Sequence, residues 1–180
     1  QTKQLAKKPG FQLINNGGTA YLQYNLQKDQ NLASVNIRRA ISMAIDRFGL
    51  CSTLGGNNQP AKTFTAKGVM YVGDSEYTSG VAKSSEAYNK YSKAEAKKLF
   101  NKGLAELGKS SITISIMADD TDSGKKTVEA LQSELTQTLG VSKFTLNEAL
   151  DRLRAMADTP GQVCTLTWRG TAYQVIWRHE

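Results

Sequence analysis

The chain has 180 residues, of which 39% are apolar and 22% charged, and its formal net charge is +7. These values are ordinary for one soluble globular domain with a sizeable core, and no apolar run approaches the ~20 residues that span a membrane. The start, QTKQLAKKPG, is polar and basic, so no signal peptide is expected, as in a processed chain or an excised fragment.

The positive charge has two interpretations. One is attraction to nucleic acid or to an anionic membrane surface, and the other is a lysine-rich, well-solvated surface. The basic residues occur in separated pairs, such as Lys7-Lys8, Arg38-Arg39 and Lys97-Lys98, and no long basic run or aromatic–basic stripe is present. This pattern favours the solvated surface, and we expect no nucleic-acid partner.

Two short strands are predicted near the N-terminus. Phe11–Ile14 and Thr19–Asn25 flank the turn signal at residues 15–18, and they could pair as a hairpin or lie as neighbours. Residues 20–25 alternate in the way of a half-buried strand. The alternation places Tyr21 and Tyr24 on opposite faces, so we expect one of the two rings to lie in the core.

A polar turn and a long amphipathic helix follow. Ser34 is the predicted N-cap, because its hydroxyl can accept a hydrogen bond from a free amide of the first turn. Gly49, or rather the pair Gly55-Gly56, is expected to end the helix. Apolar residues recur every three or four positions, as on one helix face: Val35, Ile37, Ala40, Ile41, Ala44, Ile45 and Phe48.

Residues 57–91 lack clear periodicity and are rich in Gly, Ser and Thr, which predicts either a functional segment or a long surface connection. Its expected anchors are its apolar side chains, Phe64, Val69, Met70, Tyr71, Val72 and Tyr77. A helix should then begin at the capping box of Ser92 and Glu95 and run to about Leu107, where Gly108 ends it.

The C-terminal part alternates strands and helices. Ser111–Met117 is a predicted strand, Gly124–Leu139 a helix that Gly140 stops, and Val141–Leu146 the next strand. Asn147 is the predicted cap of a further helix, and residues 163–168 and 172–177 form a predicted hairpin. We therefore expect a single α/β domain over residues 1–180, with a mixed sheet flanked by helices and a divergent tail at 149–180.

Residues that catalysis requires are scarce. The one histidine, His179, is next to the end of the chain, and no nucleophile or phosphate-loop motif is present. The acidic cluster at 119–122 lacks the spacing of a calcium loop and suits helix capping. Cys51 and Cys164 are compatible with a disulfide, although two separate thiols are favoured. We expect no enzymatic activity, no cofactor and no metal site.

The exact sequence of the first predicted strand and helix identifies a protein family more specifically than their periodicity does. YLQYN at 21–25 and VNIRRAISMAIDR at 35–47 resemble the extracytoplasmic peptide-binding proteins of ABC transporters, the oligopeptide and dipeptide group. Those proteins carry aromatic-Leu-x-aromatic-Asn and then Val-Arg-x-Ala-hydrophobic-x-x-Ala-Ile-Asp-Arg. The resemblance covers about residues 7–148. The matching residues are Tyr21, Leu22, Tyr24, Asn25, Ile37, Arg38, Ala40, Ile41, Ala44, Ile45, Asp46 and Arg47.

The resemblance implies one lobe of a type II periplasmic-binding-protein-like fold, which captures oligopeptides without covalent chemistry in a cleft between two lobes. It also implies ligand contacts at Tyr21, Tyr24, Asn25 and Trp168. The family often carries an Asp three residues after that Trp, to pair with the ligand's α-ammonium, and Thr171 stands there instead. The implied partners are an oligopeptide and ABC permease subunits, and the implied location is extracellular or periplasmic, with a lipoprotein anchor in the full-length parent.

A second hypothesis comes from another class of proteins. The basic α/β unit would be a structural module that oligomerises through its C-terminal hairpin.

Overall fold

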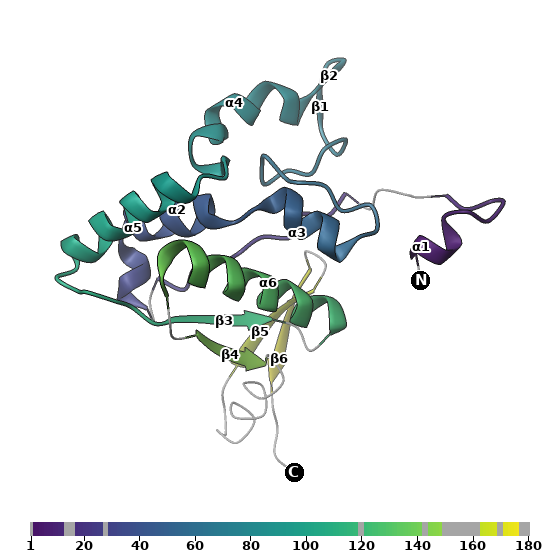
Figure 1. Cartoon of the computed structure of the whole chain (residues 1–180). Coiled ribbons are helices and arrows are strands. Elements are labelled where there is room, and N and C mark those ends of the chain that lie inside the picture. The colour runs from purple at the N-terminus through teal and green to yellow at the C-terminus, as the bar shows by residue number, and fades with distance from the viewer. Residues whose placement is uncertain are drawn as a thin grey trace, which may run out of the picture.

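A computed structural model describes residues 2–12, 17–26, 29–118, 121–141, 144–148, 163–168 and 171–176. Figure 1 shows helices α2, α3, α5 and α6 gathered above the short strands β3 and β4, with α4 and a small hairpin above them. The helices are α1 (Thr2–Leu5), the 3-10 helix η1 (Gln30–Ala33), α2 (Val35–Ala44), α3 (Arg47–Leu54), α4 (Tyr77–Asn89), α5 (Lys93–Glu106) and α6 (Asp122–Leu139). The strands are β1 (Tyr71–Val72), β2 (Ser75–Glu76), β3 (Ile114–Ala118), β4 (Phe144–Glu148), β5 (Val163–Trp168) and β6 (Thr171–Ile176).

The described strands form three pairs. β3 and β4 are parallel, with Ile114 opposite Phe144, and α6 makes the connection between them. The pairs β1–β2 and β5–β6 are antiparallel. Among the described strands, the parallel and antiparallel pairs therefore lie in three separate two-stranded sheets and do not form the one mixed sheet that was expected, whereas the predicted C-terminal hairpin is confirmed in its backbone.

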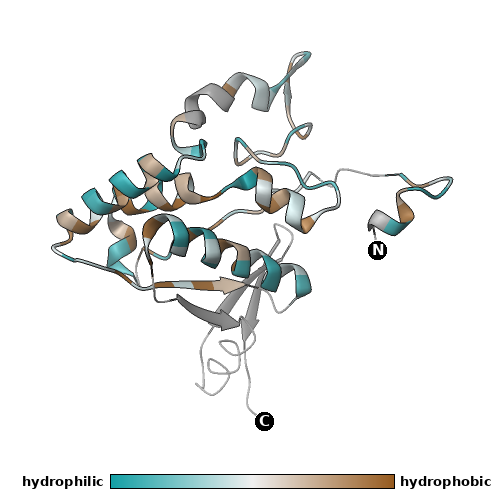
Figure 2. Ribbon diagram, viewed as in Figure 1, coloured by the Kyte–Doolittle hydropathy of each residue, from teal (hydrophilic) through white to brown (hydrophobic). Residues whose placement is uncertain are grey.

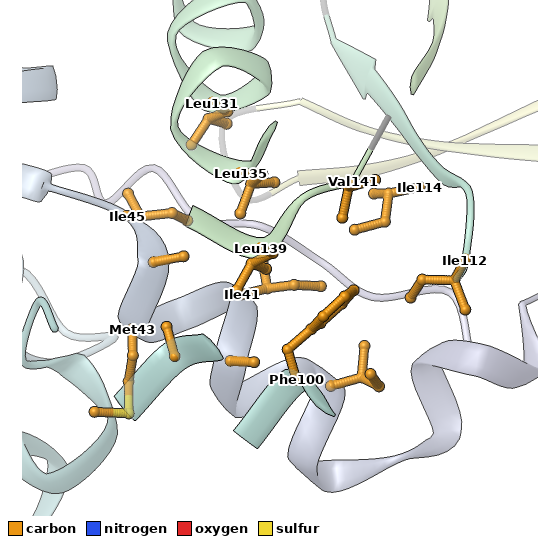
Figure 3. Close-up of a cluster of buried hydrophobic side chains, with 14 of the residues drawn as sticks. Ile41, Met43, Ile45, Phe100, Ile112, Ile114, Leu131, Leu135, Leu139 and Val141 are labelled. Atoms are coloured by element: carbon orange, nitrogen blue, oxygen red, sulfur yellow. The ribbon is translucent and has the colours of Figure 1, made fainter. Parts of the chain in front are cut away.

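One hydrophobic core joins α2, α5, α6 and β3. Gly103 allows α5 to pack closely against α2, because a Cβ built on this glycine would lie 2.7 Å from Cδ1 of Ile37. Figure 3 shows Ile41, Phe100, Leu135 and their neighbours pointing into one space from these different elements. Figure 2 shows brown, apolar residues interspersed with teal, hydrophilic ones along α6, and mostly brown residues in β3. The core residues are Leu32, Ile37, Ala40, Ile41, Met43, Ala44, Ile45, Ala96, Phe100, Leu104, Ile112, Ile114, Ile116, Val128, Leu131, Leu135, Leu139 and Val141.

The predicted helix ends at Ser34, Ser92 and Gly140 are confirmed. Ser34 Oγ accepts from the Ile37 amide and Ser92 Oγ from the Glu95 amide, so α2 and α5 begin where expected. Gly140 takes the left-handed conformation that ends α6, with φ of 73°.

The predicted long helix is wrong, because it is two helices. α2 ends at Ala44, Ile45 adopts an extended backbone, and α3 begins at Arg47. The Asp46 carboxylate accepts from the amides of Phe48 and Gly49, which caps the new helix. The break buries Ile45 but leaves Phe48, predicted on the apolar face, 76% exposed. The prediction of Gly55 as the end of the second part is confirmed.

The two predicted N-terminal strands are not found. Residues 19–25 belong to no sheet, nor do Phe11 and Gln12, while residues 13–16 lie outside the described part of the chain. No described strand lies beside residues 19–25, so the ladder of backbone hydrogen bonds that defines a strand has no partner there. Their side chains still alternate between exposed and partly buried from Tyr21 to Asn25, which is the pattern that predicted the strand.

Residues 57–91 contain more structure than predicted. They include the hairpin β1–β2, turned at Gly73 with φ of 59°, and the 13-residue helix α4. The sequence of α4, YTSGVAKSSEAYN, has a glycine and several serines, which are weak helix formers, and so gave no helical signal. The Glu76 carboxylate holds its first turn by accepting from the amides of Thr78 and Ser79.

The predicted helix after Asn147 fails at its first residue. Asn147 lies inside β4, opposite Met117 of β3, because the parallel pairing continues through Glu148. The remainder of that predicted helix falls on residues 149–162, outside the described part of the chain.

Candidate functional site

The structure decides which of the two predicted tyrosines faces outward. Tyr21 is 59% exposed, whereas Tyr24 packs against the hydrophobic core. The Tyr24 hydroxyl donates to the Arg38 carbonyl at 3.3 Å. Burial raises the pKa of Tyr24, against the opposing effect of the Arg47 and Arg38 charges. Tyr24 is therefore held inside and supports the backbone that presents Tyr21.

Tyr21 has an aromatic partner from a distant part of the sequence. Its ring meets that of Phe64 with centroids 4.8 Å apart and planes at 61°, an edge-to-face arrangement. Such pairs contribute about 0.5–1.5 kcal/mol beyond the area they bury. Phe64 is itself 71% exposed, so the two rings form an open aromatic surface and are not part of the core.

Val69, of the same connection, packs against Gly17. A Cβ added to Gly17 would lie 2.8 Å from Val69 Cγ2, so residue 17 must be small, and its φ of 67° also favours glycine. Val69 is 56% exposed. We call the ring pair of Tyr21 and Phe64 the aromatic surface. The sequence nominated Tyr21 as a contact but offered Phe64 and Val69 only as anchors of a loop.

Fewer contacts are known for the other two predicted ligand contacts, Asn25 and Trp168. Asn25 is exposed, and its carbonyl accepts from the Asp29 amide at 3.2 Å. Trp168 lies in β5 opposite Thr171 of β6, and its side chain lies outside the described part of the structure. The structure thus brings Tyr21 together with Phe64 and packs Tyr24 against the core.

A cavity of about 650 Å³ opens beside the α2–α3 break. Its walls come from residues 45–48, 60–62, 87 and 89–91, so three separate connections of the chain meet there. Most of its lining surface is apolar, and Lys62 and Lys90 are among the charged residues that line it. It borders the loop that carries Phe64.

Arg47 ties this region together. Its guanidinium donates to the carbonyls of Ser42 (2.9 Å) and Asn89 (3.2 Å), which lie at the C-terminal ends of α2 and α4. A cation is favourable at the negative end of a helix dipole, and here one cation serves two helices. Burial lowers the pKa of Arg47, although the nearby Tyr24 and Glu134 oppose that effect. The sequence Ala-Ile-Asp-Arg at 44–47 is thus explained by structure: its first two residues are buried, and its last two bond to helix ends.

Glu134 of α6 supports the same break. Its carboxylate accepts from the Asp46 amide at 3.0 Å. Burial is the main cause that raises the pKa of Glu134, while the Asp46 amide works in the opposite direction. Cys51 of α3 is a free thiol, and burial raises its pKa.

The described residues offer neither a metal cluster nor a membrane-spanning helix. Across them, no three His, Cys, Asp or Glu side chains are grouped so that they could hold a metal ion. The helices described are each too short or too polar to cross a bilayer.

Three comparisons with known proteins agree. The family described as bacterial extracellular solute-binding proteins, family 5 Middle, matches residues 1–170. The chain is 29% identical over 143 residues to the dipeptide-binding protein of Lactococcus lactis subsp. cremoris (strain MG1363), covering 74% of this chain and 25% of that protein.

Among solved structures, Listeria monocytogenes OppA bound to peptide is similar at a TM-score of 0.71 and 27% identity, covering 85% of this chain and 31% of that one. The pheromone receptor PrgZ is similar at 0.70 and 21%, covering 87% and 31%, which supports the fold alone. The chain therefore spans a quarter to a third of these relatives' length. The expected α/β class, of the type II periplasmic-binding kind, is confirmed.

Proposed function

The chain belongs to family 5 of the bacterial extracellular solute-binding proteins, and from that membership we propose that it forms one lobe of a two-lobe protein that captures oligopeptides for an ABC importer. The whole of residues 1–180 would act as that lobe. The parent protein would close its two lobes around the ligand by a hinge motion and then present it to the permease.

The observation that carries this proposal is the aromatic surface. Tyr21 and Phe64 are exposed at 59% and 71%, yet their rings contact each other, and Tyr24 of the Tyr21 segment packs against the core. Peptide sites combine main-chain hydrogen bonds with tolerant apolar walls, and rigid aromatic rings suit those walls. An exposed aromatic pair held in one orientation is what such a wall requires.

Each predicted contact receives a role in this proposal. Tyr21, together with Phe64, contacts ligand side chains, and Tyr24 holds the Tyr21 backbone from below through Arg38. Asn25 lies at the exposed end of the same extended segment and is a further proposed contact. Trp168, paired with Thr171 in the β5–β6 hairpin, is the fourth contact of this proposal, and Thr171 stands in place of an acidic anchor for the ligand's amino group.

The mechanism is binding without a covalent step. The family consists of solute-binding proteins, and we propose that this chain has no catalytic activity of its own. We further propose an extracellular or periplasmic location with a lipoprotein anchor in the parent protein, and permease subunits as its membrane partners. A single lobe holds half of the cleft, so the isolated chain should bind peptide much more weakly than the parent.

Isothermal titration calorimetry of the longer parent protein tests this function. Short peptides, from Ala-Ala to Leu-Leu-Leu-Leu-Leu, should give saturable heat, and Tyr21→Ala should weaken binding while Tyr91→Ala, at an exposed ring in the α4–α5 link, should not. The absence of heat with every peptide of the series, from correctly folded protein, would overturn the proposal.

No described observation favours the oligomerising alternative. The β5–β6 hairpin exists in the backbone, but its side chains lie outside the described part of the structure. Light scattering of the chain with and without residues 162–180 separates the two functions, because a dimer that the truncation abolishes would support oligomerisation through the hairpin.

A further inference from the structure

The loop that carries Phe64 is fixed by a side chain from another element. Nδ2 of Asn89, the last residue of α4, donates to the Lys62 carbonyl at 3.0 Å, two residues before Phe64. The Thr63 hydroxyl donates to the Thr65 carbonyl at 2.7 Å and closes the turn around Phe64. Because the Phe64 ring is mostly exposed, packing alone cannot hold it, and its place depends on this backbone.

Asn89 is in turn tied to the core-forming helices. Its carbonyl accepts from Arg47 Nη1 at 3.2 Å, and the carbonyl of the preceding residue, Tyr88, accepts from the Ser42 hydroxyl at 2.8 Å. Arg47 Nη2 also donates to Ser42 Oγ at 2.9 Å. A continuous set of polar contacts therefore runs from α2 through Asn89 to the loop that presents Phe64.

The direction of these bonds matters. The Asn89 amide nitrogen is the donor and the Lys62 carbonyl is the acceptor, so a carboxylate at the same position could not make the contact. Asn89 is half-buried at the end of α4, and a carboxylate there would face a carbonyl oxygen. Position 89 therefore requires a side chain of the length of asparagine that carries an N–H donor.

We propose that Asn89 is the positioning residue of the aromatic surface: through the Lys62 carbonyl it holds Phe64 against Tyr21 and thereby sets the preference of the site for apolar peptide side chains. Asn89 does not touch the ligand. The part of this inference that concerns peptide preference rests on the proposed function, and the part that concerns the two rings does not.

Nuclear magnetic resonance of the 180-residue chain tests the contact between the rings. With the Phe and Tyr rings labelled, the unsubstituted chain should show a nuclear Overhauser effect between Tyr21 and Phe64, whose centroids are 4.8 Å apart. Asn89→Asp keeps the size of the side chain and removes its donors, so the effect should disappear. Asn101→Asp, at an exposed position of α5, is the matched control and should keep it.

Peptide preference is measured on the parent protein by calorimetry with Leu-Leu-Leu and Gly-Gly-Gly. Asn89→Asp should weaken Leu-Leu-Leu binding about threefold to tenfold, the equivalent of one hydrogen bond, and leave Gly-Gly-Gly binding unchanged. A loss of general stability would weaken both peptides alike. Asn89→Gln, which restores an amide donor, should recover part of the preference.

Two results would overturn the inference. One is an undiminished Tyr21–Phe64 effect in folded Asn89→Asp, and the other is an equal loss of affinity for the two peptides. If Asn89→Asp does not fold, Asn89→Ala removes the same donor without adding a charge, and an undiminished effect in that variant overturns the inference as well. If the unsubstituted parent protein binds no peptide, the proposed function is refuted. The role of Asn89 in the contact between the rings would still be tested by the nuclear Overhauser effect between Tyr21 and Phe64.

Discussion

Two regions of the molecule are stabilised in different ways. The region of α2, α5, α6 and β3 buries side chains such as Ile37 and Leu135 completely, with 0% exposure each. Between residues 46 and 95, by contrast, none of the described side chains is fully buried. That stretch, which contains α3, the hairpin and α4, is ordered by polar contacts from Asp46, Arg47, Glu76 and Asn89.

The difference shows that two kinds of contact order different parts of this chain. Burial of apolar area stabilises by about 25 cal/mol per Å² and dominates the first region. A hydrogen bond contributes only about 0.5–1.5 kcal/mol net, so the second region should open locally at lower cost than the whole domain. Phe64 belongs to the second region and Tyr24, beneath Tyr21, to the first.

The largest difference should come from two phenylalanines. Phe100 is 3% exposed and Phe48 is 76% exposed. Phe100→Ala should lower the free energy of unfolding by about 3–5 kcal/mol, because it leaves a cavity in the core. Phe48→Ala should change it by less than about 0.5 kcal/mol. Urea denaturation followed by circular dichroism measures both, and similar losses in the two variants would contradict this contrast.

Two helical glycines sharpen the same contrast. Gly103→Ala should destabilise by about 1–3 kcal/mol, because the added methyl would meet Ile37 side-chain atoms at 2.7 and 2.8 Å and its backbone nitrogen at 3.1 Å. Gly80→Ala in α4 meets nothing within 4 Å and should stabilise its helix by about 0.5–1 kcal/mol. Thermal unfolding of both variants gives the sign, and a stable Gly103→Ala would show that α2 and α5 have room to separate.

The cap at the helix break should have a smaller effect. Asp46→Ala removes the acceptor for the amides of Phe48 and Gly49 and should cost about 1 kcal/mol. Glu129→Ala, at an exposed position in the middle of α6, is the control and should be close to neutral. Denaturant midpoints measure the difference. A neutral Asp46→Ala would mean that Arg47 and Glu134 hold the break without the cap.

The smallest effect is local and depends on pH. The Thr78 hydroxyl, followed by the amides of Gly68 and Thr78, holds the pKa of Glu76 at about 2, below the ordinary 4.5. A carboxyl with a depressed pKa in the folded state stabilises it above the unfolded pKa, and this contribution is lost as pH falls through 4.5 towards 2. Amide exchange of residues 68–79 should therefore accelerate over that range.

Glu76→Gln is the matched variant for this prediction. In this variant, residues 68–79 should exchange faster at neutral pH than in the unsubstituted chain. The acceleration between pH 4.5 and 2 should be absent, because the variant has no carboxylate at position 76 to be protonated. Exchange in α5, which lies in the core-rich region, serves as the internal control. The exchange rates are corrected for the pH dependence of intrinsic amide exchange. If the corrected rates of residues 68–79 in the unsubstituted chain stay constant over that range, the Glu76 carboxylate does not hold α4.

Much of the fold could be predicted wherever a local signal and burial agreed. The helix starts at Ser34 and Ser92, the end at Gly140 and the strand around Ile114 are all confirmed, because caps and periodicity act over only a few residues. Helix α4 was missed because its sequence is a weak helix former and its first turn depends on Glu76. The helix break was missed because apolar spacing continues across it.

The sequence by itself determined that Tyr21 and Tyr24 face opposite ways, since alternation is a property of extended backbone. Only the tertiary structure decided which ring is exposed, because that depends on Arg38 and on the core beneath Tyr24. Tertiary structure also brought Phe64 to Tyr21 and Asn89 to Lys62. These contacts join residues far apart in the chain, and no local pattern records which distant partner a side chain will meet.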